Sequence, residues 1–174
     1  MRRVFRDVLS CWLTVLMLGV AGARPAHAQD DPYAGGPYEP WSFLLVASTT
    51  RYEDALRAAR AAADALDLPL DLRGLTPVAG SKEPDLTLPA EMCEALAFDK
   101  TCYVPWGRWP SAGGRAVTIE LSSGYAGMRP GFYIVTAGML APGDPYHTAL
   151  LRRAKATFPS AYLKVGHAYL GCMH

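Results

Sequence analysis

Residues 131–165, GFYIVTAGMLAPGDPYHTALLRRAKATFPSAYLKV, decide the fold. The run FYIV at 132–135 is aromatic and β-branched, which predicts a buried strand that ends at Gly138. Asp144 and Pro145 follow as a helix N-cap and a proline at the first helical position, where the missing N–H costs nothing. The stretch therefore begins as strand and then helix.

The predicted helix presents one apolar stripe. That stripe consists of Leu150, Leu151, Ala154 and Phe158. Pro159 stops the helix, and the segment AYLKV at 161–165 returns to extended structure. The whole stretch reads as a strand–helix–strand unit.

The segment 42–73 repeats this pattern. Its strand FLLV at 43–46 is apolar at every position, as in strands that are covered on both faces. Thr50 and Glu53 fit a capping box, an alanine-rich helix follows until Pro69, and LDLR at 70–73 alternates as a strand. Two such units predict an α+β fold of the ferredoxin-like βαββαβ type, with two main helices on an antiparallel sheet.

Residues 1–28 have the parts of a secretory signal: Arg2, Arg3 and Arg6, an apolar run, and Ala-x-Ala at 26–28. The alternative is an uncleaved anchor, but the run of 8–23 is short against the roughly 20 residues that span a bilayer. The general secretory and twin-arginine routes both remain open. We expect a secreted or periplasmic protein with no stable membrane span after cleavage.

Cleavage would change the charge balance. Of 17 Lys and Arg residues the signal holds four, and of 16 Asp and Glu residues it holds Asp7, so 13 basic and 15 acidic residues remain and the formal charge is −2. Without a basic stripe, nucleic acid is not expected as a partner. Residues 29–40, QDDPYAGGPYEP, predict a disordered or extended leader, and 41–174 a single domain.

A long insertion, 74–131, separates the two units. It contains a short predicted helix at 88–96 and the alternating segment AVTIEL at 116–121, which predicts an added hairpin strand. The loop 122–130 would return this strand to Phe132.

Three cysteines follow the signal, an odd number for an oxidising compartment. We expect a Cys93–Cys102 disulfide within the insertion, although Cys172 could capture either partner. Cys172 and His174, with His147 and His167, lack the paired spacings of a zinc site, so no metal is predicted. Nothing else suggests a cofactor, and a Cys172 nucleophile is weighed only as a minor alternative to a non-enzymatic protein.

The insertion also carries an unusual density of aromatic and arginine side chains. Flat rings with polar edges suit carbohydrate rings and protein hot spots. The candidate binding residues are Tyr103, Trp106, Arg108, Trp109, Tyr125 and Arg129. For Trp106 and Trp109 the favoured interpretation is that they fold back as the lid of a sheet face, and an exposed binding surface is the alternative.

The two units together resemble the halves of a sporulation-related repeat (SPOR) domain. Val135 to Gly138 is similar to the apolar strand of that family ending in glycine, and residues 161–164 to its closing strand. The resemblance implies a bacterial envelope module that binds peptidoglycan glycan lacking stem peptides. Residues 48–50 and the long insertion depart from the family, and an insertion that covers the open sheet face would prevent transfer of its binding mode.

The sequence thus predicts a secreted or periplasmic, non-enzymatic binding module whose partner is cell-wall glycan or an envelope protein. The leading hypothesis is peptidoglycan binding. The alternative is a secreted protein-interaction or inhibitor domain that uses the loops of 98–130.

Overall fold

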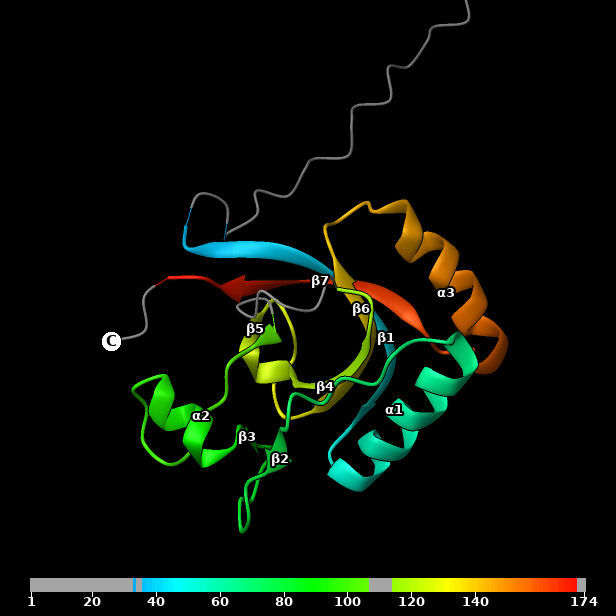
Figure 1. The fold of residues 1–174 in the computed structure, drawn as a ribbon. Helices are drawn as coiled ribbons and strands as arrows, with labels where there is room; N and C mark the ends of the chain where they lie inside the picture. The colour runs from blue at the N-terminus through cyan, green and yellow to red at the C-terminus, as the bar shows by residue number, and fades with distance from the viewer. Residues whose placement is uncertain (1–32, 34–35, 107–113, 172–174) are drawn as a thin grey trace, which may run out of the picture. The chain divides into compact units, whose positions relative to one another are not determined.

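The structure, a computed structural model, describes Tyr33, residues 36–106 and residues 114–171. The larger elements are β1 (Tyr38–Thr49), α1 (Tyr52–Leu66), β4 (Val117–Leu121), β6 (Tyr133–Leu140), α3 (Pro145–Thr157) and β7 (Tyr162–Tyr169) (Figure 1). The smaller ones are β2 (Thr76–Pro77), β3 (Leu86–Thr87), α2 (Ala90–Ala95), the 3₁₀ helix η2 (Ser122–Gly124) and β5 (Tyr125–Ala126). The predicted signal, 1–28, lies outside the described residues, and the first three residues of β1, 38–40, fall within the predicted leader.

The main sheet has five strands in the order β4-β6-β1-β7-β5. Each neighbouring pair is antiparallel, while β2 and β3 form a separate two-stranded sheet. The predicted α+β class and antiparallel sheet are therefore confirmed. The alternating segment of the insertion is also a strand, β4, which pairs with β6 as a hairpin partner.

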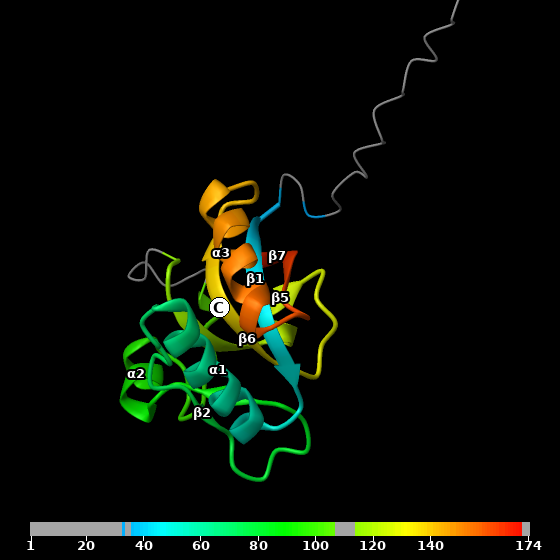
Figure 2. The ribbon, with the colours of Figure 1, turned by 90° about the vertical axis from the view of Figure 1, so that its right-hand side faces the viewer.

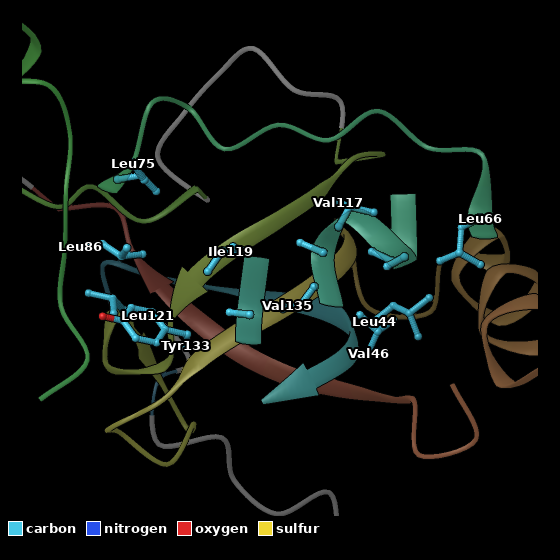
Figure 3. Packing of buried hydrophobic residues seen from close by; sticks show 14 of the residues in the cluster. Leu44, Val46, Leu66, Leu75, Leu86, Val117, Ile119, Leu121, Tyr133 and Val135 are labelled. Carbon is cyan, nitrogen blue, oxygen red and sulfur yellow. The ribbon is translucent and has the colours of Figure 1, made fainter. Parts of the chain in front are cut away.

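Helices α1 and α3 cover the same face of the sheet (Figures 1 and 2). Helix α1 packs through Ala55, Ala59 and Ala62, whose small side chains allow the backbone to approach the strands closely. Figure 3 shows the apolar side chains of this layer, including Leu44, Val46, Val117, Ile119 and Val135. The contact between the helices includes a hydrogen bond from Arg153 Nη2 to Leu66 O at 2.8 Å.

The two helix starts differ in how well they were predicted. Helix α3 begins at Pro145 with Asp144 as N-cap, because the Asp144 carboxylate accepts a hydrogen bond from Tyr146 N at 2.8 Å. The capping box at α1 is wrong: Arg51 precedes the helix and supplies no side-chain cap. Helix α1 also ends before Pro69, because Asp67 adopts a left-handed backbone with φ of 50°.

The predicted strand at 70–73 is the largest error. Only Leu70 forms a bridge, parallel to Val117, and the chain then turns. Asp71 Oδ1 accepts a hydrogen bond from Arg73 N at 3.0 Å, and Arg73 has a positive φ of 52°. This local turn interrupts the alternating pattern, so the next strand of the main sheet after α1 is β4.

Gly138 does not end its strand. It lies inside β6 with φ of 121°, where the register with β1 shifts between the Phe43–Met139 and Leu45–Thr136 pairs. One extra residue in β6 makes this a β-bulge, and glycine accepts the positive φ that the bulge requires.

The insertion covers part of the second face of the sheet. Phe43 and Leu45 of β1 belong to a separate apolar cluster with Trp106 and Tyr125 from the insertion. The rings of Phe43 and Tyr125 are 4.7 Å apart in an edge arrangement. The apolar sequence of β1 is thereby explained, because both of its faces are buried.

The insertion is also closed by the Cys93–Cys102 disulfide, with a Cα–Cα distance of 5.6 Å, which confirms the predicted pairing. Cys172 lies outside the described residues. In the part of the chain that the structure describes, no helix has the length and apolar character needed to cross a membrane.

Candidate binding groove

Strand β4 places one carboxylate inside the protein. Val117, Ile119 and Leu121 face the helices, so the alternating residues Thr118 and Glu120 face the opposite side of the sheet. Glu120 is nevertheless fully buried, because the insertion covers this part of the sheet. A buried carboxylate needs charged or hydrogen-bonding partners.

The main partners of Glu120 lie between 5 and 47 positions away along the chain. Arg73 Nη2 donates to Glu120 Oε1 at 2.5 Å, and the hydroxyls of Tyr103 and Tyr125 donate to Oε2 at 2.6 and 2.8 Å. The backbone N–H of Trp106 contacts Oε2 at 3.3 Å and the Tyr125 hydroxyl at 3.0 Å. We call these five residues the Glu120 network.

The charges of the network stabilise one another. Burial, the largest single effect, disfavours the charged Arg73 guanidinium, but Glu120 together with Tyr103 and Tyr125 outweighs burial and raises the pKa of Arg73. Burial, and then the negative charge of Glu120, raise the pKa of both Tyr103 and Tyr125 well above the ordinary value. The two phenols therefore stay neutral and donate hydrogen bonds to the carboxylate.

Arg73, in the turn after α1, also forms a hydrogen bond to the backbone of the insertion. Its Nη1 donates to Val104 O at 2.7 Å, and the Arg73 side chain is only 3% exposed. Its Nε atom is buried with no hydrogen-bond partner in the described structure. The network fixes the segment around Val104 and Trp106 on the sheet.

The sequence candidates separate into three groups. Trp106 and Tyr125 are buried and Tyr103 is partly buried, so their polar groups serve the network and do not form an exposed aromatic surface. For Trp106, this placement corresponds to the favoured interpretation, a ring folded back on a sheet face. Arg108 and Trp109 lie outside the described residues. Arg129 is exposed and lines a groove beside the network.

This groove, which we call the sheet groove, has a volume of about 230 Å³. Its lining comes from β1, β6 and β7 and from the loop between β4 and β6. The lining residues are Leu45, Ser48, Ser122, Met128, Arg129, Phe132, Ile134, Tyr162 and Lys164. Ile134 pairs with Glu120 in the sheet register, so the groove adjoins the Glu120 network.

The sheet groove combines apolar walls with positive charge. The Arg129 guanidinium lies 5.6 Å from the centre of the Phe132 ring, and Lys164 is exposed. Tyr162 is 50% exposed, so part of its side chain is accessible to a ligand. The lining contains two cations and no carboxylate, which favours an anionic ligand that also has apolar surface.

A larger hollow of about 720 Å³ lies between the start of α1 and the β2–β3 hairpin. Its lining carries both signs of charge, from Arg51, Lys82, Glu53 and Glu83. The mixed charges give no preference for one ligand class, so the sheet groove is the better candidate.

Sequence reasoning missed the contributions of Phe132, Tyr162 and Lys164, which it placed in structural strands. Tyr162 and Lys164 are two residues apart in β7 and therefore point to the same face. The exposed alternation of Tyr and Lys was a usable signal. The sequence does not show that Tyr162 and Lys164 lie beside Arg129 in the folded protein.

The histidines of the described residues form no group that could hold a metal ion. His147 is buried, its Nδ1 lies 3.1 Å from Ser42 Oγ, and burial lowers its pKa. No group of three potential metal-binding side chains occurs in the described ranges. Cys172 and His174 lie outside those ranges.

Comparison of the chain with protein-family models, with curated proteins and with solved structures found no match.

Proposed function

We propose that this protein is a secreted or periplasmic, non-enzymatic binding module that holds a carboxylated glycan in the sheet groove. The observation that carries the proposal is the pairing of Arg129 and Lys164 with exposed Tyr162 on one sheet face. Tyrosine rings pack against sugar rings, and the two cations suit a carboxylate.

The order of the main elements supports a SPOR-like, ferredoxin-like fold. The elements β1, α1, β4, β6, α3 and β7 follow one another as βαββαβ, and β4-β6-β1-β7 are neighbours in the sheet. The sheet groove lies on the face away from the two helices, which the insertion partly covers, so the glycan proposal rests on the groove's own lining residues and not on the family's binding mode.

Peptidoglycan glycan has the chemistry that this groove favours. When a stem peptide is removed, its muramic acid sugar keeps a free lactyl carboxylate that is available to cations. We therefore infer denuded peptidoglycan as the ligand, in agreement with the resemblance. The Cys93–Cys102 disulfide supports an oxidising compartment for the folded domain.

The first test is co-sedimentation with purified peptidoglycan, either intact or treated with an amidase that removes stem peptides. We expect stronger retention on the treated material. Arg129→Gln and Tyr162→Ala should each weaken retention about tenfold, which corresponds to 1.4 kcal/mol.

The control is Arg152→Gln, which removes an exposed charge from α3, outside the groove lining. Circular dichroism should show that all three variants are folded. The proposal fails if the native protein is retained on neither material, or if the Arg152 variant loses as much binding as the groove variants.

A further inference from the structure

Strand β7 forms an open edge of the sheet over half of its length. Its partner β1 pairs with all of β7, but β5 pairs only with His167 and Ala168. Residues 162–165 therefore have β1 on one side and no strand of the described chain on the other, and the loop after β5 reaches this edge only at its Val165 end, where a Cβ atom on Gly127 would lie 4.0 Å from Val165 O. An edge of this kind offers unpaired backbone groups to another chain.

The register identifies which backbone groups point outward. Leu170 N donates to Pro37 O at 2.6 Å, one step beyond the Tyr38–Tyr169 pair. Antiparallel bonding alternates along a strand, so the even-numbered residues of β7 bond to β1. The N–H and C=O groups of Leu163 and Val165 consequently point away from β1.

The side chains at this edge are unusually apolar and exposed. Tyr162 is 50%, Leu163 36% and Val165 44% exposed. The charged side chain in this stretch is Lys164, which shares its face with Tyr162 and the sheet groove. Protected edges usually carry more charge, a proline or a covering loop.

We propose that the β7 edge binds an extended segment of another protein as an added strand. The segment carries an acidic residue opposite Lys164 and apolar residues opposite Leu163 and Val165. Directly opposite residues share a face, so the acidic side chain would lie at the rim of the groove beside Lys164 and Arg129. This interaction is distinct from glycan binding, because its main contacts are the backbone groups of Leu163 and Val165.

Charge argues against a second copy of this chain as the occupant. In the two-fold register that pairs Leu163 with Val165 of another copy, Lys164 would lie opposite Lys164. Like charges directly opposite each other destabilise a strand pair. An acidic segment instead supplies the charge that the edge lacks.

The test uses a capped, fluorescently labelled peptide, Thr-Val-Glu-Val-Thr, without glycan present. We expect saturable binding by fluorescence anisotropy, and slower hydrogen exchange of the Leu163 and Val165 amides in the complex. Val165→Pro removes one outward N–H and leaves the bonds to β1 in place, so it should weaken binding at least about tenfold.

Val165→Thr is the matched control, because it changes the side chain but keeps the N–H. It should bind the peptide within about threefold of the native protein, a difference under 1 kcal/mol. A peptide with lysine in place of glutamate should bind more weakly. The inference is overturned by absent saturable binding, by equal binding of the proline variant, or by self-association through this edge without peptide. None of these outcomes bears on peptidoglycan retention, so the two proposals fail separately.

Discussion

At the scale of single residues, Glu120 is a carboxylate held inside the protein. It is fully buried and accepts hydrogen bonds from Arg73, Tyr103 and Tyr125. A buried ion pair contributes little net stability compared with well-packed apolar residues, but removing one charge leaves the other buried and uncompensated. Through Arg73 this pair connects the turn after α1 with β4 and with the Val104 carbonyl of the insertion.

Glu120→Gln keeps the shape of the side chain and removes its charge. We expect the free energy of unfolding, measured by urea denaturation, to fall by about 3 kcal/mol, because Arg73 stays charged and buried. Glu83→Gln, at an exposed position, should change it by less than about 0.5 kcal/mol. The double variant Arg73→Met with Glu120→Leu should be more stable than Glu120→Gln. Equal denaturation midpoints for the native protein and Glu120→Gln would contradict this account.

At the scale of elements, the bulge in β6 places Gly138 close to helix α3 and to the segment before β4. A Cβ atom on Gly138 would lie 3.0 Å from Gly114 O and 3.1 Å from His147 Nε2. The bulge therefore brings β6 close to α3 and to the chain that enters β4. Thr136 Oγ1 supports it by donating to Gly138 O at 2.7 Å.

Gly138→Ala should destabilise the protein by about 1–3 kcal/mol, because alanine would adopt a strained φ and also crowd its neighbours. Gly143→Ala separates these causes, since Gly143 also has a positive φ but no atom within 4 Å of an added Cβ. The measurement is the thermal midpoint of each variant. We expect Gly143→Ala to lower the midpoint less than Gly138→Ala does. A larger loss at Gly143 would show that contacts at the bulge are unimportant.

At the scale of the whole domain, we expect the free energy of unfolding to fall as the pH rises into the alkaline range. Tyr103 and Tyr125 have raised pKa values in the folded state because burial and Glu120 disfavour the phenolate. In the unfolded chain their pKa returns to about 10. The stability from the neutral phenols is fully present below pH 10 and is lost as pH rises through and above that value.

The free energy of unfolding should therefore be level from about pH 8 to 9 and fall above pH 10. Each buried tyrosine contributes a slope of about 1.4 kcal/mol per pH unit. Tyr125→Phe should be less stable than the native protein at neutral pH. Above pH 10, its free energy of unfolding should fall less steeply, by about 1.4 kcal/mol per pH unit. Urea denaturation between pH 8 and 11.5 measures both slopes, and equal slopes would mean that Tyr125 ionises as readily in the folded protein as in the unfolded chain.

The sequence by itself determined the elements whose signals are local. Asp144 and Pro145 fixed the start of α3, the apolar run of β1 indicated burial on both faces, and the short spacing of Cys93 and Cys102 favoured their disulfide. Each of these depends on residues that are close along the chain, or on a strand pattern that does not require knowledge of its partner.

The tertiary structure decided where distant residues meet. Arg73 belongs to a segment that alternates like a strand, yet it turns toward Glu120, 47 positions away. Tyr125 is a surface candidate in the sequence, but its ring packs against Phe43 and its hydroxyl donates to the buried Glu120 carboxylate. The backbone N–H of Trp106 in turn donates to the Tyr125 hydroxyl. The sheet groove forms because side chains of β7 and of the loop before β6 meet on the same face of the sheet. The sequence pattern of either segment does not show that the two segments are neighbours in space.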